Sequence, residues 1–322
     1  MGVVRIVLAA ALAAILPFAA PAQELTVKWT FVNPADSHFG KAAQAFKESV
    51  EADSGGRIKV DLFPAGALGG EREITEGIQF GSIDFAHTST SVVGNFVPDL
   101  MLFDIPFLFR DKDHARRVVD GPVGQELLAG LGEHGIVGLG FGENGFRHVT
   151  NSKKAVNTPA DLSGMSIRTM ENDIHIEAFK TLGARPTPIA WPELFAALQQ
   201  GVVDGEENPI ANIVTAKFFE VQEYLSLTGH VYAPTVIMAS PAIWKKLSED
   251  DKAIMRKAVA KAVAAQRQAV DDYERDGIAQ LEKQGMKVNP VDKQAFIDAL
   301  APAYEGFAKR FGKDRLEAIR KM

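Results

Sequence analysis

The chain has 322 residues, with 35 lysines and arginines against 41 aspartates and glutamates, and a formal net charge of −6. A net acidic chain argues against nucleic acid as a partner, and an anionic ligand would need a local positive trap. Cysteine is absent, which excludes disulfides, a thiol nucleophile and a lipidated cysteine. A chain of about 300 residues can still bury a core large enough to fold without disulfides.

Residues 1–22 have the features of a secretory signal peptide. Arg5 precedes the apolar run VLAAALAAILPFAA, which is too short to span a bilayer with ease, and small residues occupy positions 20–22. The alternative, a membrane anchor, is disfavoured by that length. We therefore expect a mature chain that begins at Gln23 and works in the periplasm without a membrane anchor.

The next hundred residues alternate between strand and helix patterns. Strands are predicted at 25–32, 57–63 and 82–89, and the helices between them at 37–54 and 70–81. This βαβαβ order is typical of a largely parallel sheet with helices on its faces. The apolar segment 99–109 contains Pro106 and is predicted to be a buried connection, not a strand.

Further along, strands are predicted at 136–142, 146–150 and 165–170, and again around 229–240. Asn172 is expected to cap one helix, and Trp191 is expected to cap another that has Pro192 at its first position. Residues 249–284 form either one long helix that could span two lobes or two helices broken near Gly277. No linker is visible, so we predict two α/β lobes joined by several short crossings.

The motif GFGENG at 140–145 matches the glycine pattern of dinucleotide-binding proteins. That fingerprint requires a helix directly after it, whereas FRHVTN follows here and is typical of a strand. A flexible, glycine-rich crossing between lobes is the preferred interpretation. The histidines show no metal-ligand spacing and no nucleophile motif is present, so we expect neither a cofactor, a metal nor catalytic residues.

Two arginines lie in segments that otherwise have the pattern of buried strands. Arg168 is in MSIRTM and Arg147 is in GFRHVTN. A guanidinium on a covered sheet is costly unless a planar acceptor meets it. For Arg168 the acceptor is either a ligand carboxylate or one of the nearby acids Asp204, Glu206 and Glu207. The same acids could instead do acid–base work, which would make the protein a periplasmic lyase or hydrolase that acts on an organic acid.

The order of motifs resembles the substrate-binding proteins of TRAP transporters, the DctP family. The stretches that carry the resemblance include LFPAGALGGEREITEGIQFGSIDF, GFRHVTNSKKAV, LSGMSIRTM and, most specifically, ALQQGVVDGEENP, and they cover nearly the whole mature chain. The resemblance implies two α/β lobes with a cleft between them and a long helix bracing both, as in other periplasmic binding proteins. It also implies capture of an organic acid and delivery to a sodium-driven membrane symporter. An ABC-type binding protein is the alternative that the VVDGEENP signature disfavours.

The resemblance assigns candidate site residues in the second lobe. The carboxylate-clamping arginine of the family falls on Arg168 and its second arginine on Arg147. The asparagine of the ENP turn falls on Asn208, and the aromatic position ahead of the helix falls on Trp191, where relatives often carry phenylalanine.

First-lobe groups are expected to complete the site when the lobes close, as in a Venus flytrap. Glu71 and Ser89 match positions that face ligand in some members of the family, and Asn33, His38 and Thr88 lie near them in the predicted site. Because Ser89 stands where sialic-acid binders carry an acid, the resemblance disfavours sialic acid.

The lobe boundaries are predicted at 23–145 with about 234–273 for the first lobe and 146–233 with about 274–322 for the second. The ligand is left open between a C4-dicarboxylate, a uronic or aldonic acid and another hydroxy acid. A dicarboxylate would use Arg147 as its second cation, whereas hydroxyl groups would be bound by His38, Glu71 and Ser89. Because Glu71 would repel a second carboxylate, we favour a hydroxylated monocarboxylate, bound by a monomer that delivers it to TRAP membrane subunits.

Overall fold

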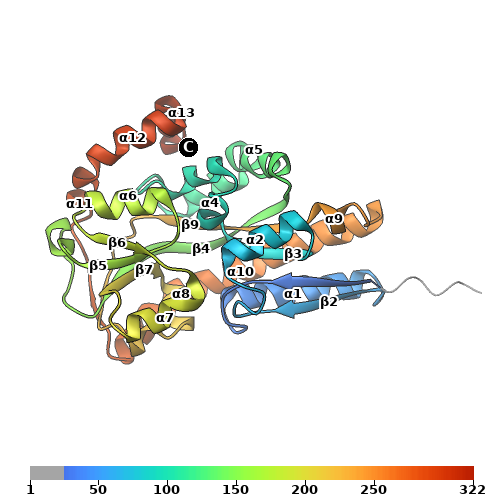
Figure 1. Ribbon diagram of the computed structural model, residues 1–322, viewed down its shortest axis with the longest axis horizontal. Coiled ribbons are helices and arrows are strands. Elements are labelled where there is room, and N and C mark those ends of the chain that lie inside the picture. The colour runs from blue at the N-terminus through green and yellow to red at the C-terminus, as the bar shows by residue number, and fades with distance from the viewer. Residues whose placement is uncertain (1–24) are drawn as a thin grey trace, which may run out of the picture.

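The computed structural model describes residues 25–322, so the predicted signal peptide lies outside the described residues. Two α/β lobes lie side by side, with the long helix α10 running along both (Figure 1). The sheet order is β2-β1-β3-β9-β4-β7-β5-β6, with β8 and β10 attached beside β4. The predicted two-lobed α/β fold with a spanning helix is therefore confirmed.

The first lobe is built from the predicted βαβαβ unit. Strand β1 pairs in parallel with both β2 and β3, and β3 then pairs antiparallel with β9. Ser37 caps the first helix by accepting a hydrogen bond from the Gly40 N–H at 3.3 Å. The elements of this lobe are β1 (Leu25–Thr30), α1 (His38–Asp53), β2 (Ile58–Phe63), α2 (Glu71–Phe80), β3 (Phe85–Ser89), α3 (Thr90–Val93), η1 (Pro98–Asp104), α4 (Lys112–Asp120), α5 (Pro122–Gly130), η2 (Leu131–His134) and β9 (Tyr232–Ala239).

The second lobe has a smaller sheet, in which β5 pairs in parallel with both β6 and β7. Asn172 caps its first helix as predicted, but Ala190, not Trp191, is the N-cap of α7, because the helix begins one residue earlier than expected. The elements are η3 (Pro159–Leu162), β5 (Ser166–Thr169), α6 (Asp173–Thr181), β6 (Arg185–Pro188), α7 (Trp191–Gln199), β7 (Gly205–Pro209), α8 (Ile210–Thr215), η4 (Phe218–Glu220), β8 (Tyr224–Ser226) and β10 (Lys287–Asn289).

A single strand, β4 (Val137–Asn151), crosses between the lobes where two strands were expected. Its first half pairs with β9, and its second half pairs with β7 and β8. The glycine-rich segment is thus part of a packed strand and not a loose linker. A Cβ on Gly142 would lie 2.0 Å from Gln266 Oε1 and 2.5 Å from Thr235 Oγ1, so this glycine leaves room for the buried Gln266 side chain of α10 against the strand.

Helix α10 (Glu249–Lys283) is continuous over 35 residues. Of the two predicted alternatives, one long helix or a break near Gly277, the structure has the long helix. A Cβ on Gly277 would lie 2.5 Å from Ile210 Cγ2, so this glycine permits close packing against α8. The helix packs on α1 and β4 at one end and on α8 at the other. It therefore holds both lobes, and the short helix α9 (Pro241–Trp244) leads into it.

The C-terminal helices α11 (Lys293–Ala299), α12 (Ala301–Phe311) and α13 (Lys313–Lys321) return from the second lobe towards α4 (Figure 1). His114 Nε2 on α4 lies 2.8 Å from the carbonyl of Ile319, while α12 also packs on α6. These helices therefore contact both lobes, and the predicted residue boundaries of the lobes stay predictions.

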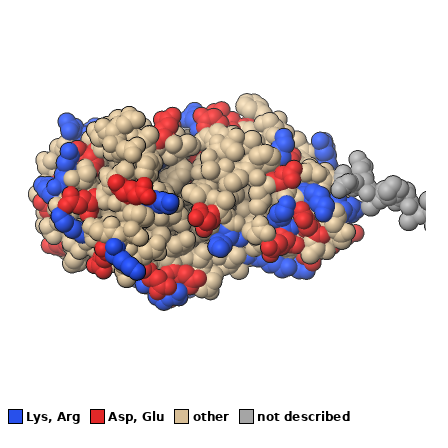
Figure 2. Space-filling view, turned by 90° about the horizontal axis from the view of Figure 1, so that it is seen from below, with Lys and Arg blue, Asp and Glu red and all other residues tan. Residues whose placement is uncertain are grey.

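Acidic and basic side chains are interspersed on the face of the molecule shown in Figure 2. No helix among residues 25–322 combines the length and the hydrophobicity that crossing a bilayer requires.

Candidate functional site

A narrow cavity of about 20 Å³ lies between the two lobes. Residues of both lobes and of the crossing strand line it: Val32, Asn33, Phe39, Glu71, Ser89, Asn144, Arg147, Arg168, Met170, Trp191, Asn208 and Asn212. A water molecule needs roughly 10–15 Å³, so in this conformation the lobes are closed around little more than one water-sized space.

A β-bulge in β4 places two polar side chains on the cavity side. The register with β9 shifts between Glu143 and Gly145, and Gly145 has a φ of +104°, in the left-handed region that favours glycine. In a regular strand, residues three apart would point to opposite faces. The bulge instead allows both Asn144 and Arg147 to line the cavity.

Arg168 is the buried arginine of the cavity that forms no salt bridge with a carboxylate within residues 25–322. It projects from β5, its side chain is 2 % exposed, and its Nε donates to the Ile189 carbonyl at 2.8 Å. Its Nη1 is buried and has no hydrogen-bond partner within residues 25–322. Burial lowers the pKa of Arg168 to about 10, which still leaves the guanidinium charged at neutral pH.

Arg147, in contrast, is paired with Glu207. Its Nε lies 2.5 Å from Oε2 of Glu207 and its Nη2 lies 2.9 Å from Oε1, with both side chains buried. His230 Nε2 and His175 Nδ1 contact the same carboxylate at 3.0 and 3.4 Å. Burial favours protonation of Glu207, but Arg147 and the two histidines outweigh it and hold the pKa of Glu207 well below its usual value.

The other two acids of the predicted cluster also serve the fold. Glu206 accepts hydrogen bonds from the Thr150 hydroxyl at 2.7 Å and from the amide of Asn208, and burial raises its pKa to about 7. Asp204 accepts from the Ser166 N–H at 2.9 Å. None of the three acids lines the cavity, so the suggested salt bridge to this cluster is made by Arg147 and not by Arg168.

A chain of asparagine amides links the lobes at the cavity. Asn33 Nδ2 of the first lobe donates to Asn212 Oδ1 of the second at 3.0 Å, and Asn212 Nδ2 donates to Asn208 Oδ1 at 2.9 Å. On the other side, Asn144 Oδ1 lies 2.6 Å from Nε2 of His38. Because that carbonyl accepts from the imidazole, the Nδ2 of Asn144 is left to donate into the cavity.

The first lobe contributes a carboxyl group at the start of α2. Glu71 Oε1 accepts a hydrogen bond from the Ser89 N–H at 2.7 Å. Burial raises the pKa of Glu71, while that N–H and the nearby arginines oppose the shift. Its other oxygen is suited to accept from a hydroxyl group of a ligand.

The structure brings most of the predicted site residues into one cavity. Asn33, Glu71, Ser89, Arg147, Arg168, Trp191 and Asn208 line it, whereas His38 and Thr88 do not. His38 is fully buried and reaches the cavity only through Asn144, and burial lowers its pKa to about 4. Thr88 is also fully buried, beside a residue that does line the cavity.

Sequence reasoning missed Val32, Phe39, Asn144, Met170 and Asn212. Two of them carried a signal. Asn144 lies within the GENG glycines, which mark a bulge, and Asn212 follows Asn208 by one helical turn at the start of α8. Within the described range 25–322, no three histidine, aspartate or glutamate side chains gather as a metal site would require.

Comparison with known proteins decides the family. Residues 30–310 match the DctP family, described as bacterial extracellular solute-binding protein, family 7. This chain belongs to that family. A solute-binding protein of Verminephrobacter eiseniae is 45% identical over 303 residues, covering 94% of this chain and 90% of that protein. The 2,3-diketo-L-gulonate-binding periplasmic protein of Escherichia coli is 36% identical, covering 86% of each.

Solved structures of DctP-family proteins share both the fold and the sequence. A TRAP periplasmic solute-binding protein of Polaromonas, bound to D-erythronate, is 51% identical with a TM-score of 0.91, covering 92% of this chain and 98% of that one. A Bordetella counterpart, with density assigned to pantoate, is 48% identical with a TM-score of 0.90, covering 92% and 99%.

These relatives are binding proteins of TRAP transporters, and the family is extracytoplasmic. The chain is therefore a solute-binding protein. The alternative of a periplasmic enzyme is set aside, in agreement with the structural use of Asp204, Glu206 and Glu207.

Proposed function

We propose that this DctP-family protein captures a small 2-hydroxy monocarboxylate, such as a short aldonate, and delivers it to TRAP membrane subunits. The observation that carries the proposal is the difference between the two arginines of the cavity. Arg168 has a buried Nη1 without a partner, while Arg147 is held by Glu207. One guanidinium without a salt-bridge partner within residues 25–322 suits one carboxylate.

The carboxylate would complete the hydrogen bonding of Arg168. An uncompensated buried guanidinium is costly, and a planar carboxylate can accept two parallel N–H bonds from its fork. A second carboxylate on the ligand would have to approach Arg147, whose fork already meets Glu207, or lie near Glu71. Either position is unfavourable, which disfavours a C4-dicarboxylate.

Hydroxyl groups of the ligand match the remaining polar groups. Glu71 and Ser89 can accept from them, and the free amide of Asn144 can donate. The relatives agree with this choice of ligand class. D-erythronate and pantoate are both 2-hydroxy monocarboxylates, and they are the ligands named for structures 51% and 48% identical to this chain. The structure with bound succinate is only 34% identical.

Delivery would depend on lobe closure. Asn33 contacts Asn212 across the cleft, and Asn95 Nδ2 donates to the Glu171 carbonyl at 2.6 Å. A ligand that touches both lobes stabilises the closed form by those extra contacts, and the membrane subunits would recognise that form. We propose that the protein acts as a monomer in this role.

A thermal-shift screen of the mature protein tests the proposal. It would include D-erythronate, pantoate, galactonate, glucuronate and succinate, and we expect a hydroxy monocarboxylate to give the largest shift. Ligand at about 100 times its Kd stabilises a protein by roughly 2.7 kcal/mol, which is a shift of several degrees. A largest shift with succinate would contradict the proposed ligand class, and consumption of the ligand, followed by NMR, would contradict a binding role.

A further inference from the structure

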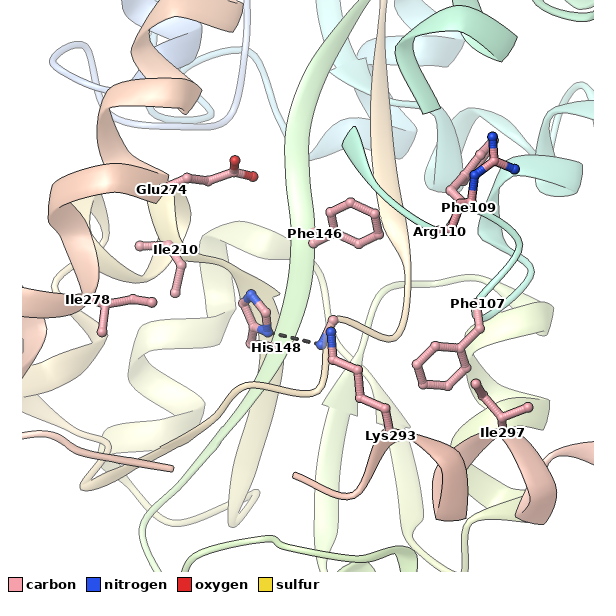
Figure 3. A pocket seen from close by; sticks show the side chains of 11 residues that line it. Phe107, Phe109, Arg110, Phe146, His148, Ile210, Glu274, Ile278, Lys293 and Ile297 are labelled. Atoms are coloured by element: carbon pink, nitrogen blue, oxygen red, sulfur yellow. Dashed lines mark hydrogen bonds between the residues drawn. The ribbon is translucent and has the colours of Figure 1, made fainter. Parts of the chain in front are cut away.

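We call the narrow cavity at Arg168, between the lobes, the solute cavity. A second, larger cavity of about 530 Å³ lies on the opposite face of β4. We call it the rear cavity. Its lining comes from both lobes, from β4 and from α10: Phe107, Phe109, Arg110, Phe146, His148, Ile210, Gly229, Glu274, Ile278, Lys293 and Ile297 (Figure 3). Its volume falls within the range of roughly 300–1,000 Å³ that is usual for small-ligand sites.

Alternation along β4 separates the two cavities. Arg147 lines the solute cavity, while its neighbours Phe146 and His148 line the rear cavity. This is the expected result of a period of two in a strand. The same backbone segment therefore forms a wall of both cavities.

The rear cavity is mainly apolar. Three phenylalanines and three isoleucines surround it, with the ring of Phe146 near the centre of the view in Figure 3. Phe107 has a φ of +53°, a conformation that is uncommon for a bulky residue, and its N–H donates to the His230 carbonyl at 2.8 Å. Backbone strain of this kind is often found at ligand sites.

The His148 ring and the Lys293 ammonium lie near each other at one end of the rear cavity. His148 Nδ1 accepts from the Gly229 N–H at 3.0 Å, drawn as a dashed line in Figure 3, so the neutral ring carries its proton on Nε2. Lys293 Nζ lies 3.2 Å, and His148 Cε1 3.8 Å, from the point that a Cβ on Gly229 would occupy. Lys293 forms no salt bridge within residues 25–322.

The other charged groups of the lining are Glu274 and Arg110. Glu274 is paired with Lys112 at 2.7 Å, and Arg110 Nη1 donates to the Arg320 carbonyl at 2.7 Å. Neither Lys293 nor Arg110 forms a salt bridge within residues 25–322, and Lys293 is the one that lies beside Gly229 and the His148 ring.

We propose that the rear cavity binds an apolar monocarboxylate, such as an alkanoate or an arylalkanoate. The carboxylate would lie against Lys293 Nζ beside the His148 ring, and the hydrocarbon part would pack on the phenylalanine and isoleucine side chains. Such a ligand has no hydroxyl groups, and in this it differs from the hydroxy acid that we propose for the cavity at Arg168.

The test compares octanoate with 1-octanol, which has the same chain and no charge. Titration calorimetry on the wild-type protein should show octanoate binding roughly tenfold or more tightly than octanol, because a charge-assisted hydrogen bond is lost in the alcohol. Lys293→Gln should reduce this preference to about threefold or less, and the matched surface change Lys309→Gln on α12 should leave it unchanged. Equal affinity for the two ligands, or an unchanged preference in Lys293→Gln, would overturn the proposal.

A second variant separates the two cavities. Arg168→Gln should retain octanoate binding within about twofold, because Arg168 is not part of the rear cavity. Loss of octanoate binding in Arg168→Gln would place octanoate in the solute cavity and overturn the proposal. None of these measurements requires the natural solute. They can therefore be interpreted even if the proposed solute class proves wrong.

Discussion

Arg168 and Arg147 both line the cavity between the lobes, yet within residues 25–322 only Arg147 forms a salt bridge with a carboxylate. At the residue scale, the proposed ligand class rests on this difference. Glu207 is shared between Arg147 and two histidines, so its charge is committed to the second lobe and to the contact with Asp104 through His175. Arg168 keeps donors that a ligand can satisfy.

Replacement of Arg168 by glutamine should weaken solute binding by about 100-fold or more, since a desolvated carboxylate clamp contributes on the order of 3 kcal/mol. Titration calorimetry with the best acid from the screen measures this loss. The control is Arg185→Gln, which removes an exposed arginine from the neighbouring strand β6 and should change the Kd little. A loss below about threefold in Arg168→Gln would contradict the clamp.

His175 predicts a pH dependence of stability. It lies 3.2 Å from Asp104 and 3.4 Å from Glu207. Burial alone would lower its pKa, but the two carboxylates outweigh burial and raise it to about 8. The folded pKa lies above the usual 6.5, so the charged His175 stabilises the folded protein. This contribution is complete below pH 6.5 and is lost as the pH rises through 8.

The wild type should therefore have a larger free energy of unfolding than His175→Gln at about pH 6. This difference should fall by on the order of 2 kcal/mol between about pH 6 and pH 9. Urea denaturation of both proteins at the two pH values measures it. An advantage that stays constant or grows with pH would show that His175 is not held in its charged form.

At the scale of elements, β4 and α10 organise the molecule. The strand belongs to both lobes, and the 35-residue helix packs on both. Gly142 and Gly277 allow the helix to approach the strand and α8 closely, since a Cβ at either position would lie within 2.5 Å of a neighbouring atom. Their role is therefore close packing, not flexibility.

Gly142→Ala should destabilise the protein by about 1–3 kcal/mol, as overpacking of a filled site does, although alanine removes backbone freedom in the unfolded chain. Gly130→Ala is the matched control, because nothing lies within 4 Å of its Cβ position and it has no positive φ. That change should be neutral or slightly stabilising. Urea denaturation of the two variants measures the contrast, and equal stability would argue against close packing at Gly142.

Local signals allowed the cap at Asn172 to be predicted, because a cap depends on residues within one helical turn. The sequence predicted two strands where the structure has the single strand β4. The continuity of β4 depends on pairing with β9 and β7, which come much later in the chain. The pairing of Arg147 with Glu207 is non-local in the same way. Sequence could list possible acids for an arginine but could not decide which arginine receives one.

At the scale of the whole molecule, the two cavities lie on opposite sides of the strand that crosses between the lobes. Rotation of the lobes that closes the solute cavity should widen the opposite side. In this conformation the solute cavity measures about 20 Å³ and the rear cavity about 530 Å³. A ligand that fills the wide rear cavity should therefore favour the closed form.

Octanoate in the rear cavity is accordingly expected to lower the Kd of the solute by several-fold, because binding at the two sites is reciprocally linked through closure. The measurement is a solute titration with and without saturating octanoate, in the wild type and in Lys293→Gln as the control. Weaker solute binding in the presence of octanoate would contradict the assigned direction of the coupling.

We propose that one arginine without a salt bridge to residues 25–322 selects one carboxylate, and calorimetric titration with D-erythronate and succinate measures this selectivity. The two acids have equal numbers of carbon atoms and differ in hydroxyl groups and in the second carboxylate. We predict that D-erythronate binds at least about 100-fold more tightly than succinate. Equal or tighter binding of succinate would contradict the claim, because Arg147 would then have to serve as a second cation in spite of Glu207.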